Sequence, residues 1–273
     1  MSYIKSYDGY NIFYNSFNLN SKKQVLFFVH GWLENWTCFK KEINYFKKKG
    51  HPIIYMDIRG HGKSDIPNKR EGYHLDLIVE DIILILNELS LKRKIVLIGH
   101  SMGGMVSLLF ASKHQKLLEK LVLLDTSYKG FSKVKVNKYL KLPSVKGEFF
   151  SHVVNFIAKH EKKYVHFEKE EDMSKITFKN EYEWLASHVI KSPITSILFF
   201  LDEMYDLNLK KNLRKIKTDT LILAGEQDEF FPQKVEKEMN KFLPNSKLIM
   251  FVDNHINVVL HADKISKTIN KFI

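Results

Sequence analysis

The stretch IVLIGHSMGG, from Ile95 to Gly104, decides the fold. Its first four residues form a short apolar run typical of a buried strand, and the residues from Met102 to His114 have a helical pattern. Between them, Ser101 has one glycine two residues before it and another two residues after it. A serine at a tight strand-to-helix turn needs this spacing, because the strained backbone leaves no room for larger neighbours. The turn would raise the Ser101 hydroxyl out of the sheet at the helix N-terminus, so the pattern predicts a nucleophile.

The same alternation of strand and helix continues on both sides of this turn. Short apolar runs predict buried strands, and apolar residues at helical spacing predict helices. We expect strands at Tyr10–Phe17, Gln24–Val29, Pro52–Asp57, Ile95–Ile98, Leu121–Leu124, Thr220–Ala224 and Lys247–Val252, and helices at Phe39–Lys49, Leu75–Leu89, Met102–His114, Val235–Phe242 and Ile265–Phe272. Strands separated by helices indicate an α/β fold class, with a mostly parallel central sheet flanked by helices.

The alternation is lost between Ser127 and Arg214, where the chain is rich in aromatic residues and looks helical. Its one compact apolar run, Ile197–Leu201, is interpreted as helix because it continues into further apolar residues. The strand-and-helix pattern resumes afterwards. We therefore interpret residues 127–214 as an inserted helical lid, and residues 1–126 and 215–273 as the two parts of one core. An apolar lid favours acyl or aromatic substrates.

Length and composition exclude several classes of protein. The chain has 273 residues, 44% of them hydrophobic, which suits a large core and excludes a disordered chain. A single cysteine, Cys38, excludes a disulfide scaffold. The net charge is +12, but only four of the 43 basic residues are arginine, so we expect a solvated lysine-rich surface and no nucleic-acid partner. With no signal peptide and no membrane-spanning run, we expect a cytoplasmic protein without stable membrane insertion. The oligomeric state stays unknown.

A second motif, His30-Gly31-Trp32, follows the expected strand at Gln24–Val29. Acyl transfer needs hydrogen-bond donors aimed at the place where a carbonyl oxygen becomes an oxyanion, and backbone N–H groups suit this role. The backbone N–H groups of Trp32 and Met102 are the candidate oxyanion hole. We expect His30 to brace the turn and not to react.

A candidate acid, Asp228, follows the expected strand at Thr220–Ala224. A carboxylate there lies at the same edge of the sheet as Ser101, where it would orient and stabilise an imidazole. Asp125, which ends another strand, is the second choice, and Glu226 and Glu229 also compete.

A candidate base, His255, follows the last expected strand, with His261 as its rival. The resulting order of Ser101, Asp228 and His255 is the nucleophile–acid–base order of one hydrolase architecture. Such a triad needs neither a metal ion nor a cofactor, and we expect neither.

Together these motifs resemble the α/β-hydrolase fold superfamily, in particular its lidded serine esterases and lipase-like members. The resemblance covers nearly the whole chain and rests on His30-Gly31-Trp32, residues 57–65, Gly99–Gly104, residues 224–228 and His255. It implies that residues 57–65, which are similar to the family's D-x-R-G-x-G-x-S loop, brace the oxyanion loop without reacting. The serine at the turn argues against the dehalogenases and epoxide hydrolases of this fold, because those use an aspartate nucleophile.

Two details bear on how far the resemblance reaches. The GHSMGG motif is similar to that of monoglyceride lipases but is shared by many members, and Asn254 stands where the family often has a glycine. The expected function is hydrolysis of carboxylic esters of small or acyl-chain substrates through an acyl-enzyme, as in carboxylesterases or monoacylglycerol lipases. Carbon–carbon bond hydrolases, lactonases, thioesterases and perhydrolases stay open as alternatives, as does a small-ligand-binding protein that reuses the pocket.

Overall fold

An eight-stranded sheet runs through the part of the chain that the computed structural model describes, which is residues 2–130, 172, 188, 192–228, 230–252, 255 and 260–273. The strands are β1 (Ser2–Lys5), β2 (Asn11–Phe17), β3 (Val25–Val29), β4 (Ile53–Met56), β5 (Ile95–His100), β6 (Leu118–Leu124), β7 (Thr220–Gly225) and β8 (Ser246–Phe251). The helices are α1 (Lys40–Lys48), α2 (Leu75–Glu88), α3 (Met102–His114), α7 (Ile194–Asp206), α8 (Lys210–Leu213), α9 (Gln233–Phe242) and α11 (Ala262–Phe272), with 3₁₀ turns at Trp36–Phe39, Arg70–Tyr73 and Gln115–Leu117.

The sheet is mostly parallel, as the sequence predicts. Its strand order is β1-β2-β4-β3-β5-β6-β7-β8, in which β1 and β2 form an antiparallel hairpin and every pair from β4 to β8 is parallel. In register, Val29 of β3 lies beside Gly99 of β5, and His100 of β5 lies beside Leu124 of β6. The loops that leave the carboxyl ends of these strands therefore meet at one edge of the sheet.

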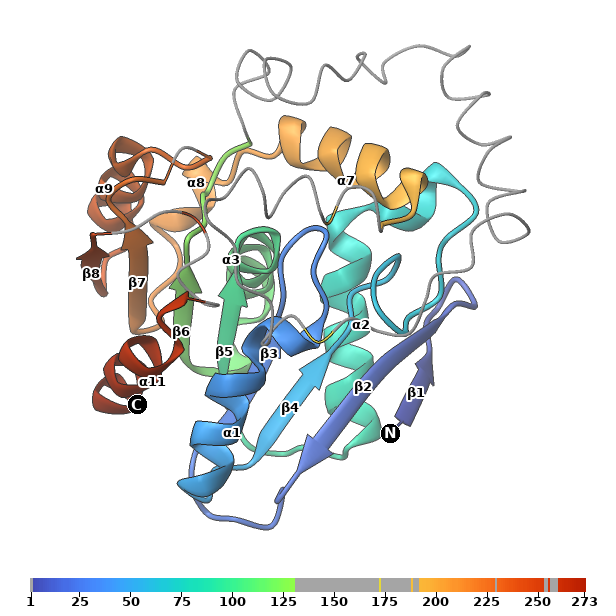
Figure 1. The fold of residues 1–273 in the computed structure, drawn as a ribbon, viewed down its shortest axis with the longest axis horizontal. Helices are drawn as coiled ribbons and strands as arrows, with labels where there is room; N and C mark the ends of the chain where they lie inside the picture. The colour runs from blue at the N-terminus through green and yellow to red at the C-terminus, as the bar shows by residue number, and fades with distance from the viewer. Residues whose placement is uncertain are drawn as a thin grey trace.

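Helices cover both faces of the sheet (Figure 1). The alternation of side chains along β3 explains how: Phe27 belongs to the apolar cluster that includes residues of α2, α3 and α9, whereas Phe28 belongs to the cluster of α1 and α11. Because both faces are buried, the parallel strands read as continuous apolar runs in the sequence.

Most elements lie where the sequence predicts them, and the differences have physical reasons. The strand expected at Tyr10–Phe17 is β2, and it forms a hairpin with one further strand, β1, at the edge of the sheet. Asp81, a charged residue of α2, is fully buried. It accepts two hydrogen bonds from the Arg59 guanidinium, Nε to Oδ2 at 2.9 Å and Nη2 to Oδ1 at 2.8 Å, and a paired carboxylate tolerates burial.

The helix expected at Ile197–Leu201 is confirmed, since it lies within α7. The rings of Phe199 and Phe200 pack at 5.2 and 5.1 Å from the ring of Tyr73, which joins α7 to the core. Figure 1 shows α7 on the side where the central strands end. Apart from residues 127–130, 172, 188 and 192–214, the expected lid lies outside the described residues, and its boundaries stay a prediction.

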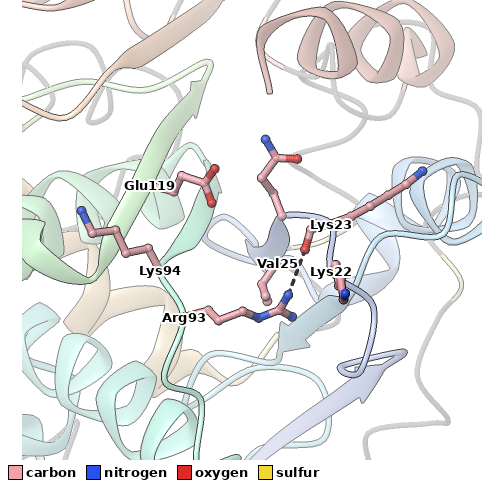
Figure 2. A pocket seen from close by; sticks show the side chains of 7 residues that line it. Lys22, Lys23, Val25, Arg93, Lys94 and Glu119 are labelled. Carbon is pink, nitrogen blue, oxygen red and sulfur yellow. Dashed lines mark hydrogen bonds between the residues drawn. The ribbon is translucent and has the colours of Figure 1, made fainter.

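The opposite, amino edge of the sheet carries a basic hollow of about 370 Å³ (Figure 2). The Arg93 guanidinium donates there to the backbone carbonyls of Leu19, Ser21 and Lys23, at 2.6 to 3.3 Å. The Lys23 ammonium donates to the carbonyl of Lys49. Arg93 and Lys23 therefore stabilise these loops through hydrogen bonds to backbone carbonyls.

Within the described residues, no helix is both long and apolar enough to cross a membrane.

Candidate active site

The turn at Ser101 has the strained backbone that the glycine spacing predicts. Ser101 lies between β5 and α3 with φ 50° and ψ −119°, a conformation that few non-glycine residues adopt. A Cβ on Gly99 would collide with the carbonyl of Gly103, and one on Gly103 would collide with the carbonyl of Val29. A Cβ on Gly104 would lie 2.6 Å from the side chain of Thr126. Side chains at these three positions would displace α3 from the sheet.

Ser101, His255 and Asp228 form one hydrogen-bonded chain at the carboxyl edge. The Ser101 Oγ lies 2.9 Å from His255 Nε2, and His255 Nδ1 lies 2.8 Å from Asp228 Oδ2. The second carboxylate oxygen of Asp228 accepts a hydrogen bond from the backbone N–H of Phe231 at 2.8 Å. With Asp228 accepting at Nδ1, the imidazole presents Nε2 as the acceptor for the serine proton. All three side chains are buried.

Two opposing effects act on the pKa of His255. Burial favours the neutral imidazole, but the charge and hydrogen bond of Asp228 outweigh it, so the pKa of His255 is raised above its ordinary value. The positive charge on His100 acts in the opposite direction and limits the rise. The rings of Phe230 and Phe231 lie 4.9 and 5.2 Å from the imidazole and keep its surroundings apolar.

The rival residues of the sequence analysis lie elsewhere. The Asp125 carboxylate lies 3.9 Å from His100 Nε2 and is the neighbour of a different histidine. Glu226 is exposed, and Glu229 lies outside the described residues. His261 is the residue that precedes α11. Of the candidates that the structure describes, Asp228 and His255 are the pair within hydrogen-bond distance of each other and connected to Ser101.

The predicted oxyanion loop, which begins at His30-Gly31-Trp32, passes beside Ser101. A Cβ built on Gly31 would lie 3.0 Å from the Ser101 Cβ and 2.8 Å from Glu34 Oε2, so a larger residue would push against both side chains. Trp32 follows directly, and its indole N–H donates to the carbonyl of Ser196 in α7 at 3.3 Å. Met102 is the first residue of α3, where a backbone N–H has no acceptor within the helix. The two predicted oxyanion donors thus belong to the segments that flank Ser101.

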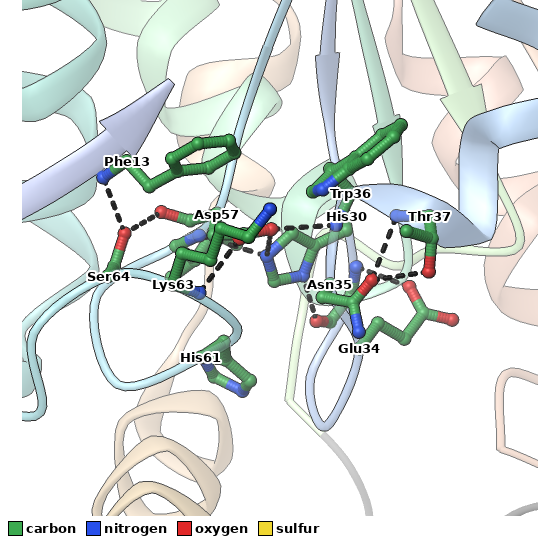
Figure 3. Close-up of polar contacts among 12 residues, drawn as sticks. Phe13, His30, Glu34, Asn35, Trp36, Thr37, Asp57, His61, Lys63 and Ser64 are labelled. Carbon is green, nitrogen blue, oxygen red and sulfur yellow. Dashed lines mark hydrogen bonds and ion pairs between the residues drawn. The ribbon is translucent and has the colours of Figure 1, made fainter. Parts of the chain in front are cut away.

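The loop at residues 57–65 supports this oxyanion loop through several hydrogen bonds (Figure 3). His61 Nε2 accepts from the backbone N–H of Leu33 at 3.0 Å, and the Asp57 carboxylate accepts from that of Trp36 at 2.8 Å. His30 Nε2 accepts from the backbone N–H of Ile58 at 2.9 Å. These contacts agree with the bracing role that we expected.

The bracing histidines His30 and His61 are neutral. Burial lowers the pKa of His30 to about 4 and that of His61 to about 3. Each ring accepts through Nε2 and contacts a backbone carbonyl through Nδ1, at 2.8 Å for His30 and 3.1 Å for His61. A neutral ring is the form that makes both contacts at once.

The sequence reasoning missed a buried pair beside the serine. Glu34 Oε2 lies 2.9 Å from His100 Nδ1 and accepts the backbone N–H of Gly31 at 2.6 Å. The Glu34 carboxylate raises the pKa of His100 against the cost of burial, and His100 lowers the pKa of Glu34. A signal was present, since His100 precedes Ser101 directly and Glu34 follows the oxyanion motif, but the partners are 66 residues apart in the sequence.

The comparison with family models decides the identity of the fold. A family model described as the alpha/beta hydrolase fold matches residues 24–261. The chain belongs to the α/β-hydrolase fold family. Among its relatives is the AB hydrolase superfamily protein YisY of Bacillus subtilis (strain 168), which is 28% identical over 249 residues that cover 90% of each chain.

Two further likenesses to α/β hydrolases concern the fold and one local segment. A solved structure of the esterase EaEST from Exiguobacterium antarcticum has a TM-score of 0.77 at 22% sequence identity, and the match covers 99% of this chain and 98% of that one. Epoxide hydrolase 4 of Mus musculus is 35% identical over 103 residues, which are 38% of this chain and 28% of that protein. Membership of this family supports an enzyme of the α/β-hydrolase type with a small-molecule substrate.

Proposed function

We propose that the protein is a serine hydrolase that cleaves carboxylic esters through an acyl-enzyme intermediate. The observation that carries the proposal is the hydrogen-bonded chain from Ser101 through His255 to Asp228, with distances of 2.9 and 2.8 Å. Nucleophile, base and acid have the mutual geometry that such a reaction requires. The adjacent imidazole of His255 supplies the activation that a serine hydroxyl lacks in water.

In the first half of the reaction, His255 Nε2 takes the proton of Ser101 while Oγ attacks the ester carbonyl carbon. The carbonyl oxygen becomes an oxyanion and accepts hydrogen bonds from the backbone N–H groups of Trp32 and Met102. Asp228 stabilises the imidazolium and fixes its tautomer. The imidazolium then gives its proton to the leaving alcohol, and the acyl group stays on Ser101.

In the second half, His255 removes a proton from water, and the resulting hydroxide attacks the acyl carbon. The Ser101 oxygen leaves, takes the proton back from His255, and the carboxylic acid is released. Every proton is thus returned within one cycle, and no other reactant is needed.

The substrate class is proposed as esters with small or acyl-chain acids. Support comes from the apolar rings of Phe230 and Phe231, which pack against His255, and from the fold shared with an esterase. The local match to an epoxide hydrolase does not redirect the proposal, because Ser101 occupies the position where the family resemblance implies aspartate in those enzymes.

Hydrolysis of a series of p-nitrophenyl esters of increasing acyl length tests the proposal. Wild type, Ser101→Ala and Ser112→Ala are compared; Ser112 is a partly buried serine of the same helix, with its Oγ donating to the carbonyl of Leu109 at 2.8 Å. We expect Ser101→Ala to lose several orders of magnitude in turnover and Ser112→Ala to retain it. Full activity in Ser101→Ala would refute the mechanism, and wild type without activity on any ester would refute the substrate class.

A further inference from the structure

The buried pair of Glu34 and His100 touches three segments of the proposed site. Glu34 accepts the backbone N–H of Gly31 in the oxyanion loop at 2.6 Å, and its contact with His100 reaches the residue before the serine. His100 Nε2 lies 3.1 Å from the backbone carbonyl of His255. The pair therefore connects the oxyanion loop, the serine turn and the loop that carries the proposed base.

With Glu34 ionised, as its pKa lowered to about 2 indicates, these contacts require His100 to be protonated. Its Nδ1 faces a carboxylate oxygen and its Nε2 faces a carbonyl oxygen, both of which are acceptors. A neutral imidazole has one N–H and satisfies one of them, whereas the imidazolium donates to both. His100 is completely buried and Glu34 nearly so, which leaves no water to replace a lost contact.

A purely structural role is a poor explanation for this arrangement. A buried ion pair adds little stability compared with apolar residues of similar size, because both charges must be removed from water. The pair instead fixes the orientation of the segments around Ser101. Its three hydrogen bonds connect the Gly31 amide, the residue before Ser101 and the His255 carbonyl.

We propose that the Glu34–His100 ion pair is a positioning device that fixes the His255 backbone and the Gly31 amide, so that the base and the oxyanion donors face Ser101 together. The inference rests on the proposed function. The pair does not touch the substrate. It acts through His255 and through the oxyanion loop.

The charge of His100 also acts on the base. The two rings lie 5.4 Å apart, centre to centre, so a positive His100 disfavours a second positive charge on His255. Removal of this charge should let His255 hold its proton to higher pH. The titratable groups that interact with one or both of these histidines are Glu34, His30, Glu42, Asp125 and Asp228. Glu236 interacts with the two aspartates Asp125 and Asp228.

Two variants with a side-chain amide separate the two contacts of His100, because each amide replaces one of the two ring nitrogens. In His100→Asn the amide N–H₂ lies near the position of Nδ1 and keeps the contact with Glu34, but nothing donates to the His255 carbonyl. In His100→Gln the amide N–H₂ lies near the position of Nε2 and keeps that second contact. Both variants are neutral. Glu34→Gln is the third variant, and Glu42→Gln is the control, since Glu42 is a buried carboxyl for which no other described residue supplies a hydrogen bond.

The measurements are kcat and KM for a p-nitrophenyl ester, the rate at which a fluorophosphonate labels Ser101, and the pH dependence of each rate. We expect kcat to fall about 10²-fold in His100→Asn with KM nearly unchanged, because a small displacement of the base has that effect. His100→Gln should recover about a tenth or more of the wild-type kcat. In all three variants the acid limb of the rate profile, where protonation of His255 reduces the rate, should move to higher pH. The pH dependence of Glu42→Gln should resemble that of wild type.

The outcomes separate this inference from the proposed function. Labelling of Ser101 without ester turnover would refute the substrate class and still report on the pair. If His100→Asn and Glu34→Gln kept the wild-type labelling rate and acid limb, the pair would have no positioning role. Should the variants not fold, histidine ¹⁵N NMR of the wild type decides: we expect one imidazolium that persists well above pH 7, and its absence would overturn the inference.

Discussion

The two edges of the central sheet carry charge in opposite ways. At the carboxyl edge, charged and titratable side chains are buried and contact one another, as in the pairs Glu34–His100 and Asp228–His255. At the amino edge, Arg93 and its lysine neighbours are exposed and donate to backbone carbonyls of loops. Both edges belong to the same rigid strands, so the difference comes from the loops alone.

Backbone strain separates the two edges in the same way. Both have non-glycine residues with positive φ, but at the amino edge these are Asn18 and Ser90, small polar residues in exposed or partly exposed turns. At the carboxyl edge they are Leu33, Ser101 and Asp125, which are all buried. Ser101 and Asp125 directly follow β5 and β6, and Leu33 lies in the loop after β3. Strain in buried residues persists only where the surroundings enforce it, and it gathers at functional sites. The comparison therefore supports the proposal that the chemistry takes place at the carboxyl edge, whereas the side chains of the amino edge stabilise loops.

The largest effect should come from Asp228→Asn, which breaks the hydrogen-bonded chain at the carboxyl edge. An amide in place of the carboxylate favours the wrong tautomer of His255, and we expect kcat to fall about 10³- to 10⁴-fold. The pKa of His255 should also fall, because the charge that raises it is gone, so the acid limb of the residual activity should move to lower pH. The pH dependence of kcat/KM measures both effects.

Asp125→Asn is the matched comparison, since its carboxylate lies near His100 and not near His255 Nδ1. We expect a loss at least tenfold smaller than in Asp228→Asn. Equal losses in the two variants would assign the role of triad acid to neither residue alone.

A smaller but still severe effect is expected from Gly103→Ala. Its Cβ would meet the backbone carbonyls of Val29 and His30, which belong to β3 and the oxyanion loop and have no flexible end to move aside. We expect a fall in Tm and loss of Ser101 labelling together. Gly50→Ala, at a turn with positive φ but open space around it, is the control that should lose some stability and keep labelling. Retained labelling in Gly103→Ala would show that the turn tolerates a side chain.

Sequence reasoning works well where a constraint is local. The spacing of Gly99 and Gly103 around Ser101 reflects a collision between these two residues, which are close in sequence. Apolar runs likewise mark strands that are buried on both faces, so a local pattern in the sequence predicts both features. The choice between Asp228 and Asp125 was not readable, because each follows a strand at the same edge. Burial of Asp81 with Arg59, and of Glu34 with His100, depends on partners 22 and 66 residues away, and no local pattern marks a charged residue for such a pair.

Glu42→Gln should change the pH dependence of stability by a moderate amount. Glu42 is completely buried, and burial raises its pKa to about 8 from an ordinary 4.5. Below pH 4.5 the carboxyl is neutral in the folded and in the unfolded chain, so its ionisation does not lower the free energy of unfolding. Between pH 4.5 and 8 it ionises in the unfolded chain alone, so the free energy of unfolding of the wild type should fall by up to about 1.4 kcal/mol per pH unit.

The glutamine variant does not ionise and should lack this contribution. Urea unfolding at pH 4, 6 and 8 measures it: the free energy of unfolding of the variant should gain on that of wild type as the pH rises. A difference that is constant across the three pH values would contradict the raised pKa.

The smallest effect should come from Arg93→Lys at the amino edge. The guanidinium fork reaches the carbonyls of Leu19, Ser21 and Lys23 together, and one ammonium group on a flexible stem does not reproduce that geometry. We expect a fall in Tm of about 2–4 °C, the shift typical of the loss of one modest interaction in a chain of this size. Because the loop lies at the far end of β3 from Ser101, kcat/KM and the labelling rate should not change. A change in either rate would mean that the amino edge communicates with the site, and the contrast between the two edges would then describe where charge is buried but not where the chemistry is controlled.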